Sequence, residues 1–285
     1  MGKVGQYWKL IVLVGLALAN LAIWTAAAGV RPRDFVQVSF LDVGQGDAIL
    51  VESANRSQIL IDGGPNRRVL RELSRAMPPF DRFLDVVIET HPDKDHIGGL
   101  PEVVNRYTVG AFFEPGVESD NRIDDELHRR VKEKNIPVFL ARAGMILDMG
   151  DGSLVQILFP DRDPSGMDTN DASIVAKYIF GGSCFLFTGD SPTKIEEYLV
   201  SVYDNKLKCD VLKAGHHGSR TSTGDIFVSA VSPSVVVISS GEGNSYGHPH
   251  KEVLDILSQA DVKILKTAEN GTIRIKSDGQ TISVK

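Results

Sequence analysis

Short apolar runs separated by glycine-rich turns recur along the chain from residue 36 onward. Runs such as residues 36–41 and 235–239 are short, rich in valine and bounded by turn residues, which is typical of buried strands. Longer stretches between such runs, for instance residues 193–202, indicate helices. The predicted strands are residues 36–41, 48–52, 58–61, 86–88, 111–113, 138–140, 154–159, 173–180, 183–188, 210–213, 235–239, 262–265, 272–276 and 281–284. The predicted helices are residues 67–77, a segment after residue 100, and residues 124–132, 193–202, 225–230 and 251–259.

The order of these elements predicts the fold class. Many strands come first, strands and helices alternate after Asp190, and no internal linker, repeat or low-complexity segment interrupts them. Two sheets with helices on their outer faces fit this order, so we predict an α/β protein, a four-layer αββα sandwich, over residues 34–285. Ligand sites in such sheets gather beyond the carboxyl ends of strands.

The first 33 residues have a different character. No residue between Lys9 and Arg31 is charged, and residues 10–23 are almost wholly apolar. About 20 apolar residues span a bilayer as a helix, whereas the basic lead and the small residues 26–28 also fit a cleaved secretory signal. We predict a membrane anchor or signal peptide over residues 1–33, favour the anchor because the run is long, and place the domain outside the cytoplasm. A buried core helix is the alternative.

Charge and cysteine content bear on the possible functions. The formal net charge is −6, and the first 34 residues contribute +3, which leaves −9 for the remainder. An acidic domain is not typical of a non-specific nucleic-acid binder, although bound metal ions would neutralise part of that charge.

Cys184 and Cys209 are too few for a disulfide scaffold and lie in or beside apolar runs, so we predict buried thiols in preference to a bridge.

Six of the seven histidines fall in three short clusters. The first cluster follows the strand at residues 86–88 and contains His91, Asp93, Asp95 and His96. Nitrogen and oxygen ligands without thiolate are typical of a catalytic zinc, manganese or iron site. A solvated polar loop is the alternative.

Three further groups follow predicted strands and could complete a metal site. Asp190 could bridge two metals, although a strand that ends in Gly-Asp is a common turn. His216 and His217 form a pair between glycines, which favours metal binding or catalysis over a structural role. For His248 we weigh metal binding, phosphate contact or proton transfer against loop packing.

Taken together, these motifs resemble the metallo-β-lactamase fold superfamily and, within it, the carboxy-terminal domain of ComEC-type competence proteins. The matching strings are FLDVGQGDA (40–48), IDGG (61–64), THPDKDHIGG (90–99), NDASIV (170–175), TGD (188–190), HHGS (216–219) and YGHPH (246–250). The similarity runs in motif order from about residue 34 to the C-terminus. It implies an αββα sandwich and a dinuclear hydrolase.

Two features depart from the usual superfamily pattern. Asp93 stands where a histidine is usual, as in ComEC-like members, and this harder ligand favours manganese over zinc. The usual Gly-His-Thr string before Asp190 is missing, and residues 170–175 occupy that region. The resemblance therefore leaves one of the two ions weakly held or absent. The long membrane channel of ComEC proteins is missing as well, so DNA uptake does not carry over.

The resemblance also implies roles for individual residues. His91, Asp93 and His216 would hold one Zn²⁺ or Mn²⁺ ion, and Asp95 and His96 would hold the second, with Asp190 between the two. The ions would lower the pKa of a shared water. The expected catalytic residues are Asp95, His217, His248 and Lys213.

Among the catalytic residues, His217 or His248 would protonate the leaving group. Lys213 would either pair with an anionic substrate or cap its strand.

The leading hypothesis is an extracytoplasmic, metal-dependent phosphodiesterase or nuclease acting on DNA, with single strands favoured over duplex by analogy. A hydrolase of a small-molecule ester, lactone or phosphoester is the second hypothesis. A non-catalytic binding module on the same fold is the third, and the near-complete ligand set argues against it. No basic stripe typical of a nucleic-acid channel is visible in the sequence. The sequence indicates no protein partner; the membrane is a partner through residues 1–33.

Overall fold

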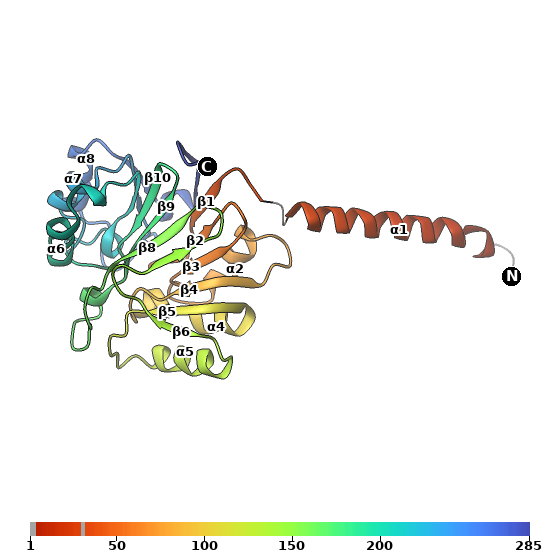
Figure 1. Cartoon of the computed structure of the whole chain (residues 1–285), viewed down its shortest axis with the longest axis horizontal. Helices are drawn as coiled ribbons and strands as arrows, with labels where there is room; N and C mark the ends of the chain where they lie inside the picture. The colour runs from red at the N-terminus through yellow and green to blue at the C-terminus, as the bar shows by residue number, and fades with distance from the viewer. Residues whose placement is uncertain (1–3, 30–31) are drawn as a thin grey trace.

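The computed structural model describes residues 4–29 and 32–285, and its first element is a long apolar helix, α1 (Val4–Gly29). The window Tyr7–Trp24 has a mean hydropathy of 1.7, and none of it is buried. Figure 1 shows this helix extending away from the α/β body. By length and composition α1 could cross a membrane, a property that a secretory signal sequence shares.

Two mixed sheets form the body of the protein within the described residues. The first sheet runs in the order β15 (Ile282–Val284), β14 (Ile273–Ser277), β1 (Val36–Phe40), β2 (Ile49–Glu52), β3 (Gln58–Ile61), β4 (Phe83–Ile88), β5 (Thr108–Glu114) and β6 (Val138–Leu140). The second runs in the order β13 (Lys263–Lys266), β12 (Val235–Ile238), β11 (Val211–Lys213), β10 (Ser183–Phe187), β9 (Val175–Phe180), β8 (Leu154–Phe159) and β7 (Ile146–Asp148). The chain thus builds most of one sheet, then the other, and returns to the first with its last two strands.

Three apolar cores hold these layers together. Between the sheets, Phe40 of β1 lies against Phe187 of β10 with ring centroids 6.3 Å apart. Helices cover the outer face of the first sheet, namely α2 (Arg68–Ala76), α4 (Leu100–Arg106) and α5 (Arg122–Glu133). Others cover the second, namely α6 (Thr193–Tyr203), α7 (Asp225–Val231) and α8 (Lys251–Gln259). The resulting order helix–sheet–sheet–helix, visible in Figure 1, confirms the predicted αββα sandwich.

The two cysteines correct one prediction. Cys184 of β10 and Cys209, just before β11, are joined in a disulfide with Cα atoms 5.1 Å apart. Because β10 and β11 are parallel neighbours, their starting ends lie side by side and bring the two sulfurs together. The predicted burial holds, but the prediction of free thiols is wrong, since the sequence does not show which strands are adjacent.

Strand direction brings the polar motifs to one place. β3 and β4 are parallel neighbours in the first sheet, and β10 and β11 are parallel neighbours in the second. Their carboxyl ends therefore lie at one edge of each sheet. The residues that follow these four strands are, in chain order, Asp62, the 91–96 cluster, Asp190 and the 215–218 turn.

Candidate metal centre

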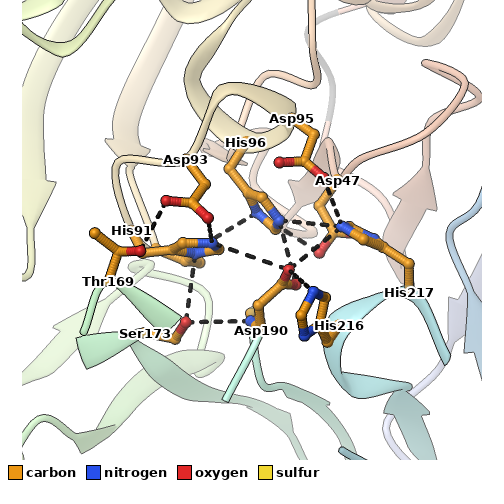
Figure 2. A network of polar contacts seen from close by, with 12 residues as sticks. Asp47, His91, Asp93, Asp95, His96, Thr169, Ser173, Asp190, His216 and His217 are labelled. Atoms are coloured by element: carbon orange, nitrogen blue, oxygen red, sulfur yellow. Dashed lines mark hydrogen bonds and ion pairs between the residues drawn. The ribbon is translucent and has the colours of Figure 1, made fainter. Parts of the chain in front are cut away.

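Two aspartates and two histidines from three chain segments meet at one point. His96 Nε2 lies 3.2 Å from Asp190 Oδ1 and 3.3 Å from His217 Nε2. His217 Nε2 lies 3.4 Å from Asp190 Oδ2 and 3.2 Å from Asp95 Oδ2. Figure 2 shows these side chains pointing toward one another, and we call the four residues the Asp190 ring. Converging imidazole and carboxylate groups of this kind are typical ligands of a divalent ion.

Asp62 orients His96 within the ring. Its Oδ2 atom lies 2.7 Å from His96 Nδ1, and its two oxygens also accept hydrogen bonds from the backbone N–H and the hydroxyl of Thr90. Because Nδ1 donates to Asp62, the Nε2 atom of a neutral His96 keeps its lone pair toward the ring. Carboxylates that hold a ligand histidine in this way are a regular feature of metal sites.

The carboxylates in and around the Asp190 ring favour positive charge on its two histidines. Burial lowers the pKa of His96, but the carboxylates of Asp190 and Asp62 outweigh it and raise that pKa well above its ordinary value. Burial likewise opposes protonation of His217, yet Asp190 and Asp47 raise its pKa to about 9. Protons on the two imidazoles balance the carboxylates in the metal-free protein, and a divalent ion would take their place. The donor set therefore fits such an ion.

His91 offers a further ligand atom beside the ring. It is fully buried, and its Nε2 atom has no hydrogen-bond partner in the described part of the chain. This atom lies 3.8 Å from Asp93 Oδ2 and 4.0 Å from Asp190 Oδ2. Burial and the neighbouring His96 lower the pKa of His91 well below its ordinary value, so the His91 imidazole is neutral. Its Nε2 atom, which has no hydrogen-bond partner among the described residues, faces the carboxylates of Asp93 and Asp190. A second ion between His91, Asp93 and Asp190 would satisfy this atom.

One strained turn aims both His216 and His217 at Asp190. The two residues have φ values of 47° and 56° inside the short η3 turn (Gly215–Gly218), a left-handed conformation that is unfavourable for residues with a Cβ. His216 Nε2 lies 3.6 Å from Asp190 Oδ2, but His216 forms no hydrogen bond or ion pair with His91 or Asp93 among the described residues. It is His217, expected to be a proton donor, that faces Asp95 and His96.

Lys213 lies inside the protein and not in an open cleft. Its side chain is 1% exposed, and its ammonium group forms an ion pair with Asp47 and donates to the carbonyl oxygen of Gly189 at 2.8 Å. It also lies 3.6 Å from Asp190 Oδ1. The anionic partners of Lys213 in this structure are carboxylates of the protein itself.

His248 stands at the outer side of the two histidines. Its ring centroid is 5.7 Å from that of His216 and 6.3 Å from that of His217. Burial and these two imidazoles lower the pKa of His248 to about 4, so it is neutral at neutral pH. Gln45, whose side-chain oxygen accepts from the Gly241 backbone N–H, turns its amide nitrogen toward His248 Nδ1 at 3.5 Å. The proton of the neutral ring therefore resides on Nε2.

The segment that replaces the missing ligand string contacts the metal-site residues through hydroxyl groups. Ser173 Oγ lies 3.3 Å from His91 Nδ1 and accepts a hydrogen bond from the backbone N–H of Asp190. Thr169 donates to Asp93 Oδ1 at 2.8 Å. A cavity of about 490 Å³ opens beside this segment and is lined by Met167, Asp168, Thr169, Asn170, Asp171, Pro192, His216 and Thr221.

Sequence reasoning missed two residues of this site, Asp47 and Asp62. Both lie in strings that match the superfamily, but Asp47 stands in a glycine-rich turn before a predicted strand and Asp62 opens a turn after one, so the sequence indicates turn residues at both positions. For Asp62 the available signal was its position directly after a strand, the same signal that identified Asp190, whereas Asp47 gave no such signal.

The fold and the site agree with the family to which the chain belongs, the metallo-beta-lactamase superfamily, whose model matches residues 41–242. The chain is 32% identical to ComE operon protein 3 of Bacillus subtilis over 268 residues, 87% of this chain and 34% of that protein. It is also 32% identical to competence protein ComA of Neisseria gonorrhoeae, over 85% of this chain and 32% of that protein. The chain thus spans about a third of the length of these homologous proteins.

A solved structure supports the fold independently. CmlA, a diiron beta-hydroxylase from Streptomyces venezuelae, superposes with a TM-score of 0.54 at 15% identity, covering 86% of this chain and 54% of that one. At that identity the likeness supports the fold alone.

Proposed function

We propose that the protein is a metal-dependent phosphodiesterase that cleaves DNA outside the cytoplasm. The observation that carries the proposal is the Asp190 ring, in which two imidazole nitrogens lie 3.3 Å apart between two carboxylates. Without their protons, these two nitrogens would face each other with lone pairs, a repulsive arrangement that a cation between them would relieve. A binding module that holds no metal ion would not need this arrangement.

The distances favour a revised ligand set. We assign Asp95, His96 and His217 to one ion, His91 and Asp93 to a second, and Asp190 to both. Asp190 is the one carboxylate of this set that His216 contacts among the described residues, so we leave His216 out of both ligand sets. When bound, Zn²⁺ or Mn²⁺ ions supply a water of lowered pKa and positive charge against phosphoryl oxygens.

Other residues would position groups and donate hydrogen bonds. Lys213 and Asp47 form a buried pair that holds Asp190 and His217 in place, so both are positioning residues. His248 is neutral and carries its proton on Nε2, so it would donate a hydrogen bond to a phosphate oxygen and would not act as a strong acid at neutral pH. Asp93 keeps a side chain that is 40% exposed, the most open of the ligand carboxylates.

The choice of DNA rests on the relatives. Competence protein ComA is named for competence, and the chain aligns with a third of it and with a third of ComE operon protein 3. The extracytoplasmic location rests on the apolar helix α1 and on the Cys184–Cys209 disulfide, since disulfides persist in oxidising compartments.

One observation favours the second candidate function, hydrolysis of a small ester, lactone or phosphoester. Neither lysine nor arginine lines the cavity beside His216, whereas Asp168 and Asp171 do. A nucleic acid would bind more weakly beside this acidic cavity wall than beside a basic one. Only bound metal ions would attract its phosphates there.

The test is cleavage of a fluorogenic single-stranded DNA by the full-length chain in detergent, with Mn²⁺ or Zn²⁺ added after chelation. We expect cleavage that Asp95→Ala abolishes and that Asp255→Asn, an exposed aspartate of α8, leaves unchanged. No cleavage, or cleavage unaffected by Asp95→Ala, would contradict the proposal. Metal-dependent hydrolysis of small phosphodiesters or lactones without DNA cleavage would support the second candidate.

A further inference from the structure

A second cluster of carboxylates and imidazole lies next to the loop that carries His91. Glu89 directly follows β4, and Asp124 and His128 lie four residues apart on α5, on the same face of that helix. One ligand atom from each of these three residues lies within 4.8 Å of the other two. Glu114, the last residue of β5, adds its Oε2 atom at 2.5 Å from His128 Nε2. We call these four residues the Glu89 cluster.

The side chain of Glu89 forms no hydrogen bond or ion pair with the other three residues of this cluster. The residue is 2% exposed, and its Oε2 atom has no hydrogen-bond partner in the part of the chain that the structure describes. His128 cannot supply one, because its Nδ1 lies 2.9 Å from Asp124 Oδ1 and its Nε2 faces Glu114. Burying an unpaired carboxylate is strongly unfavourable, so Glu89 needs either a proton or a cation.

We propose that the Glu89 cluster binds a divalent cation separate from the Asp190 ring. The carboxylate oxygens of this cluster suit Mn²⁺ or Zn²⁺, and His128 Nε2 would become a further ligand if the ion took the place of the proton between His128 and Glu114. A cavity of about 590 Å³ borders the cluster at Asp124, and its wall also includes Glu118 and Asp120. These acidic residues would attract a cation toward the cluster.

The position of the cluster gives the cation a structural role. Asn121, the N-cap residue of α5, already donates from its side-chain amide to the carbonyl oxygen of Pro92 at 2.8 Å. A cation shared by Glu89 and α5 would add a second connection on the other side of His91. The two connections together would fix the loop that presents His91 and Asp93 to the metal centre.

The competing explanation is a proton on Glu89, and Glu89→Gln separates the two. Glutamine has the shape of a protonated glutamate, so it would replace a protonated Glu89 without altering metal binding. It lacks the charge that a cation requires, so it would remove a bound ion. Glu133→Gln is the matched control, because Glu133 is an exposed residue at the end of α5.

The experiment uses the full-length chain in detergent with Asp190→Asn, which disables the Asp190 ring and leaves the Glu89 cluster intact. After chelation we titrate Mn²⁺ and measure bound metal by mass spectrometry and the melting temperature. We expect Asp190→Asn to retain an ion that raises the melting temperature, and Asp190→Asn with Glu89→Gln to lose both the ion and the shift. Asp190→Asn with Glu133→Gln should keep both.

Equal Mn²⁺ binding with and without Glu89→Gln would overturn the proposal, and so would the absence of any bound ion in Asp190→Asn. If Glu89→Gln prevents folding, Glu114→Gln provides a second comparison, because it keeps the shape of another carboxylate of the cluster and removes its charge. If Asp190→Asn prevents folding, the otherwise wild-type chain should bind one ion more than its Glu89→Gln variant.

Discussion

Asp62 Oδ2 lies 2.7 Å from His96 Nδ1, and this contact fixes the direction in which His96 presents its other nitrogen. Asp62 is itself held by two hydrogen bonds from Thr90, the residue that precedes His91. One carboxylate at the end of β3 therefore sets the geometry of the metal loop after β4. The centre depends on this outer contact as well as on its ligands.

Replacement of Asp62 should weaken metal binding without removing a ligand. In Asp62→Asn the amide no longer holds the Nδ1 proton of His96 with a full negative charge, so Nε2 becomes a poorer ligand. We expect a loss of about 10- to 100-fold in Mn²⁺ affinity, the usual effect of losing such a partner. Isothermal titration of the chelated chain measures it, with Asp255→Asn as the control. Equal affinities for Asp62→Asn and the control would show that the contact is irrelevant to the centre.

Removal of Lys213 should destabilise the whole domain. Lys213→Met keeps the length of the side chain but leaves the Asp47 carboxylate buried without its ion-pair partner. Breaking a buried pair in this way costs about 3–5 kcal/mol in the free energy of unfolding. Chemical denaturation of the chelated chain measures this change.

The double variant Asp47→Asn with Lys213→Met separates the effect of losing the ion pair from the effect of changing the side-chain volume. We expect it to be more stable than Lys213→Met alone, since it buries no unpaired charge. A double variant whose destabilisation is the simple sum of the two single changes would mean that Asp47 and Lys213 do not interact.

Glu196 should make stability decrease as the pH rises. Burial raises its pKa from the ordinary 4.5 to about 7, although the backbone N–H groups of Thr223 and Gly224 donate to its carboxylate and oppose the shift. Between these pH values the folded chain keeps a proton that the unfolded chain has lost, so stability falls with rising pH by on the order of 3 kcal/mol.

The comparison with Glu196→Gln measures this contribution. Denaturation at several pH values between about 4 and 8 should show that the wild-type chain loses stability relative to the variant. A constant difference between the two across this range would contradict the raised pKa.

The helix α1 should anchor the protein in a membrane. Leu16→Arg places a charge in the middle of the apolar window, at a cost of about 2.5–3.5 kcal/mol for insertion. We expect the full-length chain to remain in the membrane fraction after alkaline extraction, and Leu16→Arg to move to the soluble fraction, with Leu16→Ile as the control. A wild-type chain recovered in soluble form and shortened by the leader would instead indicate a cleaved signal.

Much of the fold could be predicted from the sequence because its strands are short, valine-rich and clearly bounded. The αββα arrangement followed from the order of elements, and the clusters around His91, Asp190 and His216 followed from their positions after strands. One edge strand was missed, β7 (Ile146–Asp148), which has only three residues and none of them buried.

Contacts between distant segments could not be predicted in the same way. The pairing of Lys213 with Asp47 requires knowledge of how the two sheets face each other, and the choice between His216 and His217 depends on a left-handed turn. The disulfide likewise depends on the adjacency of β10 and β11. Local sequence patterns identify candidate ligands and charged groups, whereas the packing and pairing of distant strands decide which of these groups come into contact.

The most direct test of the metal centre is the number of Mn²⁺ ions bound by the full-length chain and by Asp190→Asn, measured after chelation and saturation with Mn²⁺. Asp190 contacts His96, His216 and His217, so its loss should remove ions that Asp255→Asn retains. We predict fewer bound ions per chain in Asp190→Asn than in the wild-type chain. The same number of ions bound with the same affinity in both proteins would contradict the account.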